Sequence, residues 1–175
     1  QARLAANERQ QVAAQAKLAE FPSYRVVSSV ALTLDDLQKE LREGEAYYKM
    51  MVAGDDAYAI WVTPASARAW KLAAGPKSLE REVDALRETI TTVRDGQIQT
   101  FPFDVALAHK IYGELFRPVE AELAAVRHLV FEPDGAMLRL PPNLLVMDQA
   151  SVDTYKQRAA AGGDAEFDFR GVKWF

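Results

Sequence analysis

The sequence predicts an α/β fold with a mixed sheet: an antiparallel three-strand meander, then two long helices, then a buried strand parallel to another. Between residues 46 and 72, three segments rich in β-branched and aromatic residues are separated by short polar turns. From residue 79 onward, apolar residues recur about every 3.6 residues, the period of a helix, instead of every second residue. Residues 129–131, Leu-Val-Phe, return to a strand pattern. A helical connection between two strands of one sheet favours parallel pairing.

The N-terminal residues predict a separate helix. Residues 2–19 are mostly good helix formers, and their larger apolar residues, Leu4, Val12 and Leu18, are sparse. Pro22 ends this pattern. We therefore divide the chain into a helix over residues 1–20 and a domain over residues 21–175. A helix with so few apolar residues buries little apolar surface by itself. We therefore expect it to pack either on its own domain or on a part of the protein that precedes Gln1.

The first part of the domain predicts a short helix and the meander. Thr33 followed by Asp36 is typical of a helix N-terminus, and Gly44 lies beyond the helix. Strands are expected over residues 46–52 and 57–63, joined by a turn at 54–56 that begins with Gly. A second turn at residues 64–66 leads to a third strand over 67–72.

Two long helices should follow. The first runs from about residue 79 to 94 and ends before Gly96; its apolar face is formed by Leu79, Val83, Leu86, Ile90 and Val93. The second is capped by Asp104 and reaches Pro118, where a kink or a restart is expected. A further helix over residues 151–161, capped by Ser151 or Asp153, would end at Gly162, and residues 164–170 are expected to form a loop.

The last four residues, 172–175, predict the start of a strand. Trp174 and Phe175 would be buried against a partner element. Gln1 is not an initiating methionine, and no turn or polar tail follows the strand pattern at Phe175, so we expect both ends of this chain to continue in a longer protein. An exposed sheet edge there would also allow a homodimer.

Composition excludes several classes of function. The net charge is -4, and acidic and basic residues are interspersed along the sequence without a basic stripe. Nucleic acid is therefore not expected as a partner. No apolar run approaches the roughly 18 residues that span a membrane, and no membrane partner is expected. The chain has no cysteine, which rules out disulfides and thiolate metal sites. We expect a cytoplasmic location.

No residue pattern predicts a catalytic, cofactor-binding or metal site. The two histidines, His109 and His128, are far apart in sequence, and without cysteines they do not make a conventional zinc set. His109 is expected to pack on its helix, and His128 directly precedes a strand. Residues 73–76, Ala-Ala-Gly-Pro, lack the glycines of a phosphate loop. The aspartates at 55, 56 and 134 are explained as turn residues.

One segment is more specific. An apolar strand at 129–131 is stopped by Pro133-Asp-Gly135, and a Leu-Pro pair follows at 140–141. This order resembles the signature of the CHAT family, a caspase-like and separase-like group of cysteine peptidases. Gly44-Glu-Ala46 opening a strand and the Leu-Phe-Arg-Pro break at 115–118 lie at the intervals that the family leads us to expect. The resemblance covers residues 21–175, with an apparent insertion between residues 145 and 175.

The resemblance implies a function for the longer protein. CHAT domains pair an N-terminal pseudo-peptidase half with a catalytic half whose histidine and cysteine lie further along the chain. This chain looks like the supporting half of a cysteine endopeptidase and, without a cysteine, should be inactive alone. The implied partners are the C-terminal catalytic half and proteins bound through N-terminal helical repeats, of which residues 1–20 would be the last helix. The alternative is a non-enzymatic protein-interaction scaffold.

Overall fold

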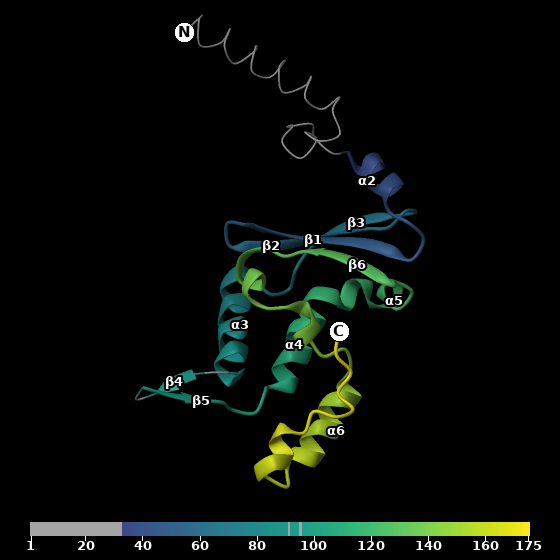
Figure 1. Cartoon of the computed structure of the whole chain (residues 1–175). Coiled ribbons are helices and arrows are strands. Elements are labelled where there is room, and N and C mark those ends of the chain that lie inside the picture. Colours follow the sequence, from purple (N-terminus) through teal and green to yellow (C-terminus); the bar gives the residue numbers. More distant parts are fainter. Residues whose placement is uncertain (1–32, 91, 95) are drawn as a thin grey trace, which may run out of the picture. The chain divides into compact units, whose positions relative to one another are not determined.

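The computed structural model describes residues 33–90, 92–94 and 96–175 (Figure 1). The chain divides into two units, Gln1–Glu40 and Leu41–Phe175. The helix expected over residues 1–20 lies outside the described residues. Within the first unit, α2 (Leu34–Glu40) begins as expected, because the Thr33 hydroxyl accepts from the Asp36 N–H at 3.2 Å and the Asp36 carboxylate accepts from the Thr33 N–H at 3.2 Å.

The second unit contains the predicted mixed sheet. Its strands are β1 (Glu45–Ala53), β2 (Asp56–Val62), β3 (Ala67–Lys71) and β6 (His128–Glu132), in the order β3-β2-β1-β6. β1, β2 and β3 form the antiparallel meander, and β6 pairs with β1 in parallel. The mixed sheet and its parallel strand are confirmed.

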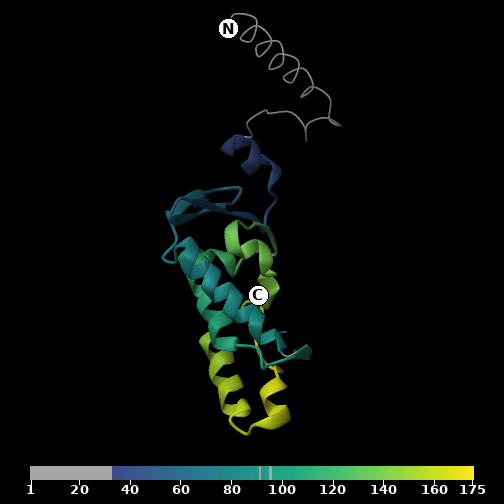
Figure 2. The ribbon, with the colours of Figure 1, turned by 90° about the vertical axis from the view of Figure 1, so that its left-hand side faces the viewer.

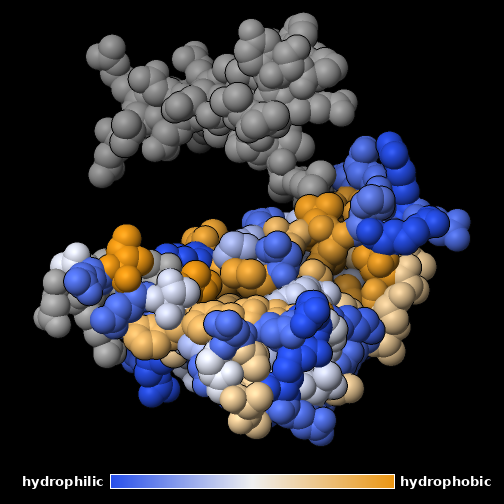
Figure 3. All heavy atoms as spheres, turned by 60° about the horizontal axis from the view of Figure 1, so that its bottom comes forward, coloured by the Kyte–Doolittle hydropathy of each residue, from blue (hydrophilic) through white to orange (hydrophobic). Residues whose placement is uncertain are grey.

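Helices cover one face of this sheet (Figure 1). α3 (Pro76–Ile90) and α4 (Val105–Phe116) lie on the same side of the sheet (Figure 2). Their buried residues share one core with alternate residues of β1 and β2. Tyr48 on β1 lies at the centre of this core, and its hydroxyl donates to the Leu115 carbonyl at 2.7 Å. The largest fully buried side chains are those of Trp61, Tyr48, Tyr112, Phe116, Met50, Leu86, Ile111, Leu115, Met137, Leu145, Val62 and Val83. Hydrophilic residues are interspersed with hydrophobic ones over the face in Figure 3.

The last strand of the sheet is less buried than the sequence predicts. In β6 only Leu129 and Phe131 pack against the core, and Val130, which points to the other face, is 54% exposed. An apolar run of three residues does not reveal that β6 lies at the end of the sheet.

The prediction that the first long helix runs to residue 94 is wrong. α3 ends at Ile90, and the chain then forms a hairpin of β4 (Thr92–Arg94) and β5 (Gln97–Gln99). The β-branched residues at 91–93 favour a strand, and Asp-Gly at 95–96 is a common hairpin turn. Gly96 has a φ of 75°.

The second helix follows the prediction. The Asp104 carboxylate accepts from the Leu107 N–H at 2.9 Å and caps α4. Pro118 lies in the 3-10 turn η2 (Arg117–Val119), after which α5 (Glu120–Leu123) restarts the helix.

After β6 two 3-10 turns, η3 (Gly135–Arg139) and η4 (Pro142–Leu144), lead to α6 (Gln149–Ala159). The cap of α6 is Asp148, which accepts from the Ser151 N–H at 2.7 Å, so neither Ser151 nor Asp153 is the cap. Part of the loop expected at residues 164–170 is a 3-10 helix, η5 (Gly163–Phe167).

The C-terminal residues do not extend the sheet. Trp174 forms an isolated bridge with Val146, and the Phe175 N–H donates to the Leu145 carbonyl at 2.9 Å. The Phe175 ring stacks on Phe116, with centroids 4.6 Å apart. The expectation that these aromatic residues need a partner element is wrong, because they pack on the core of their own unit. A homodimer edge at residues 172–175 therefore has no structural support.

Candidate functional site

A hollow lies where the end of β3 meets the C-terminal half of α4. Its volume is about 490 Å³, and it is lined by Trp70, Lys71, Ala73, Lys110, Gly113, Glu114, Arg117 and Pro118. β3 and the residues after it supply one wall, and one side of α4 supplies the other. Residues 110, 113, 114 and 117 lie three or four apart, so the helical period brings them together.

A lysine and two glutamates join α3 to α4 beside this hollow. The Lys110 ammonium donates to the Glu82 carboxylate at 2.5 Å and to the Glu114 carboxylate at 2.6 Å. The side chains of Glu82 and Glu114 are only 13% and 18% exposed. The Lys110 side chain is 53% exposed, so water screens these ion pairs in part, and they link the two helices with the strength of partly buried pairs.

The surroundings shift the pKa values of the two carboxyl groups in opposite directions. Burial raises the pKa of Glu114, and its hydrogen bond with Glu82 raises it further. Burial would also raise the pKa of Glu82, but hydrogen bonds from Glu114, Lys110 and Ser78 lower it. The second oxygen of each carboxyl group is buried and accepts from no other described group. A proton on Glu114 that is donated to Glu82 satisfies both oxygens.

Arg117 is the cation of this hollow whose charge is not paired. Within residues 33–90, 92–94 and 96–175 its guanidinium has no ion pair and no hydrogen bond, whereas Lys71 pairs with Asp56 at 2.7 Å. The guanidinium lies over Gly113, where a Cβ atom would be 2.9 Å from its Nη2. The indole Nε1 of Trp70 is buried and has no acceptor in the described part of the chain.

The arrangement is better suited to binding than to acid–base catalysis. A catalytic carboxyl group must reach the proton that it transfers. Here the second oxygen of each carboxyl group is buried, so neither can reach a proton on a molecule in the hollow. The guanidinium of Arg117, by contrast, is exposed and free to bind an anion.

The residues considered from the sequence lie elsewhere. The His109 Nδ1 is 2.9 Å from the Val146 carbonyl, and its ring stacks on Tyr112, which confirms its packing role on α4. His128 is exposed on β6. The Asp134 carboxylate accepts from the N–H groups of Val52 at 2.8 Å and Gly135 at 2.7 Å, so its role in the turn is confirmed.

The other two turn aspartates make ion pairs instead. Asp55 pairs with Lys77 at 3.1 Å, and Asp56, which opens β2, pairs with Lys71. Over the described residues no group of three or more His, Asp or Glu side chains is placed to hold a metal ion. In the same part of the chain no helix has both the length and the apolar character to cross a membrane.

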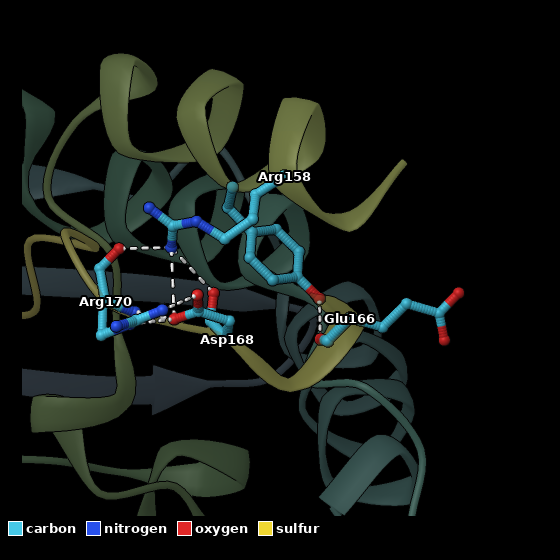
Figure 4. Close-up of polar contacts among 5 residues, drawn as sticks. Arg158, Glu166, Asp168 and Arg170 are labelled. Carbon is cyan, nitrogen blue, oxygen red and sulfur yellow. Dashed lines mark hydrogen bonds and ion pairs between the residues drawn. The ribbon is translucent and has the colours of Figure 1, made fainter. Parts of the chain in front are cut away.

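A second polar cluster holds the C-terminal segment on α6 (Figure 4). Arg158 donates to the carbonyls of Asp168 at 3.0 Å and Arg170 at 2.6 Å. Hydrogen bonds from the Arg170 side chain and backbone hold the pKa of Asp168 well below its usual range. The Tyr155 hydroxyl donates to the Glu166 carbonyl at 2.7 Å. These groups are all satisfied within the segment, so the cluster is structural.

A second hollow, of about 380 Å³, lies beside β6. Its lining is mostly apolar: Leu123, Val126, Arg127, Leu129, Pro142, Asn143, Met147 and Phe175. Leu129 is the member of β6 that faces it.

The fold and these sites define a mixed α/β protein with a four-stranded sheet. Comparison with models of protein families, with curated proteins and with solved structures finds no match in any of the three.

Proposed function

We propose that this chain is the non-catalytic supporting part of a caspase-like cysteine endopeptidase of the CHAT family, located in the cytoplasm and inactive by itself. The proposal starts from the resemblance of residues 21–175 to that family. The structural observation that carries it is that β6 is the outermost strand of the sheet and has no further strand beside it in the described part of the chain, so a catalytic half would continue the sheet there.

The edge of β6 offers unpaired backbone groups. β6 is the last strand in the order β3-β2-β1-β6, and the His128 N–H donates to the Gly44 carbonyl at 3.2 Å on the β1 side. Because backbone groups alternate in direction along a strand, those of Leu129 and Phe131 point away from β1. A further strand would hydrogen-bond to them.

The apolar hollow beside this edge supports the same interpretation. A strand that pairs with β6 directs alternate side chains toward the helical layer, where Leu129 lines the hollow. Strand addition of this kind gains affinity from main-chain hydrogen bonds and specificity from side-chain pockets. A partner strand with one large apolar side chain at that position would fit.

The test is co-expression of this chain with the segment that follows it in the reading frame. We expect the two to purify together and the complex to cleave peptides. Leu129→Glu, which places a charge in the hollow, should abolish the association, whereas Val130→Glu on the same strand but the opposite face should not. Circular dichroism of each variant checks that it folds. A reading frame without a histidine and a cysteine after Phe175, or equal effects of the two variants, would contradict the proposal.

The alternative is a non-enzymatic interaction scaffold, in which the edge of β6 takes a strand from an unrelated protein. The two proposals differ in what the complex does: only the first yields peptide cleavage. Under both, this chain alone shows no turnover of denatured casein or fluorogenic peptides, because it has no cysteine. Partners bound through N-terminal helical repeats belong to the first proposal and lie outside the described residues.

A further inference from the structure

The hollow between β3 and α4 has one positive charge that no described residue neutralises. Of its three cations, Lys71 pairs with Asp56 at 2.7 Å and Lys110 bridges Glu82 and Glu114. Arg117 has no such partner in the described part of the chain. Arg117 directly follows α4, and the dipole of this helix offsets only about half an elementary charge of the guanidinium.

The remaining lining is apolar. The apolar part of the lining consists of Trp70, Ala73 and Pro118. The Trp70 ring makes an edge-on contact with the Tyr48 ring, with centroids 5.8 Å apart, which fixes its position. A volume of about 490 Å³ lies within the range of about 300–1,000 Å³ of small-molecule pockets.

We propose that this hollow binds a small molecule that has one carboxylate group and an apolar body. The carboxylate pairs with the Arg117 guanidinium, whose planar donors match two carboxylate oxygens. The apolar body lies against Trp70 and Pro118. This binding site is independent of the edge of β6 and of the function proposed above.

The charges favour a carboxylate over a phosphate. One uncompensated guanidinium balances a monoanion, whereas a second negative charge would lie near the C-terminal end of α4 and the carbonyl groups there. The charges of Lys71 and Lys110 are already offset by Asp56 and Glu82.

Gly113 has a specific part in this site. A Cβ atom at position 113 would be 2.9 Å from the Nη2 and 3.5 Å from the Nε of Arg117, so the missing side chain leaves the space that the guanidinium occupies. Gly113→Ala should therefore displace the guanidinium while keeping its charge.

The experiment is a titration of the protein with benzoate, followed by the indole N–H resonances of the three tryptophans in nitrogen–proton spectra. The Trp70 resonance, assigned with Trp70→Phe, should shift with millimolar benzoate, and those of Trp61 and Trp174 should not. Arg117→Gln should weaken binding about tenfold, as expected for the loss of a charge-assisted pair. Gly113→Ala should weaken it in the same direction.

Lys77→Gln is the matched control, because it removes one cation whose side chain is 85% exposed and outside the hollow. It should leave benzoate binding unchanged. Equal weakening by Lys77→Gln and Arg117→Gln would show a non-specific charge effect and overturn the proposal, as would the absence of any Trp70 shift.

Further ligands, compared at constant ionic strength, define the chemistry of the site. Benzamide, which lacks the charge, and acetate, which lacks the apolar body, should bind more weakly than benzoate. Phenyl phosphate should not bind more tightly, and tighter binding would overturn the preference for a carboxylate. A peptide with a C-terminal Phe, compared with its amide, tests whether the carboxylate comes from a peptide end; tighter binding than benzoate would overturn the assignment to a small molecule.

Discussion

Gly135 shows how one residue fixes the turn after β6. Its φ is 57°, a region that side chains with a Cβ atom rarely adopt, and a Cβ atom there would be 3.1 Å from the Val52 Cγ2. The neighbouring Asp134 carboxylate binds the Val52 N–H, so the turn is attached to the end of β1. A substitution at this position affects both the backbone and the contact with β1.

We expect Gly135→Val to lower the free energy of unfolding by about 1–3 kcal/mol, the usual cost of a strained backbone conformation. Gly54→Val is the matched control, because Gly54 has a φ of 63° but no atom within 4 Å of its Cβ position. Urea denaturation of both variants separates strain from contact. The larger loss should occur at Gly135, and an unchanged thermal melt of Gly135→Val would refute the turn.

The raised pKa of Glu114 predicts a pH dependence of stability. Because the pKa of Glu114 is raised in the folded state, its contribution to stability is complete below the unfolded value of 4.5 and is lost as pH rises through the folded pKa. Glu114→Gln keeps a neutral donor and should remove this loss. The difference in unfolding free energy, variant minus wild type, should therefore increase as pH rises above 4.5. A difference that does not change with pH above 4.5 would contradict a raised pKa of Glu114.

These residues also mark the limit of sequence reasoning at this scale. The role of Asp134 was predictable, since Pro-Asp-Gly bonds within its own turn. The carboxyl pair was not, because Glu82 and Lys110 are 28 positions apart on different helices. The sequence signal was the spacing of Lys110 and Glu114 by four residues, which is common on exposed helices and does not by itself indicate burial.

At the scale of elements, the sequence predicted correctly those features that depend on residues close together in the chain. The meander, the cap at Asp104 and the restart at Pro118 depend on neighbouring residues, and all three are confirmed. The end of α3 was predicted wrongly because Val93 continues the apolar spacing of the helix, although Asp-Gly at 95–96 favours a hairpin. The exposure of β6 depends on its position in the sheet, which its own residues do not determine.

The attachment of the C-terminal segment to α6 gives a test at this scale. Arg158→Ala removes donors to the carbonyls of Asp168 and Arg170, and should destabilise the segment by about 1–2 kcal/mol. Hydrogen exchange of residues 168–172 should become faster. Arg170→Ala is a comparison: it removes an 89% exposed side chain and its bonds to the Asp168 carboxylate but keeps both bonds from Arg158, so it should speed exchange less. Equal protection in the two variants would contradict a role for Arg158.

At the scale of the whole unit, the C-terminus belongs to the core. Phe175 contacts Phe116 and Tyr112, with ring centroids 4.6 Å and 5.8 Å apart, and these two residues lie on α4. The sequence could not show this, because a terminal Trp-Phe pair has the same pattern whether it packs on its own domain or on another.

Phe175→Ala should therefore lower the free energy of unfolding by about 1–3 kcal/mol, somewhat less than a fully buried phenylalanine. The measurement is urea denaturation, with Phe167→Ala as the control, since Phe167 is 48% exposed. The control should change stability little. If Phe175→Ala were equally harmless, the terminal residues would not be part of the core.

The parallel pairing of β1 with β6 has a consequence for synthesis on the ribosome. The Val52 N–H donates to the carboxylate of Asp134, which lies 82 positions later in the chain. The three meander strands, by contrast, are joined by short turns. The three meander strands emerge first, with Ala46, Tyr48 and Met50 still uncovered until α3 and α4 have been made. Nascent chains arrested before residue 105 should accordingly bind chaperones, and those that extend past residue 140 should release them.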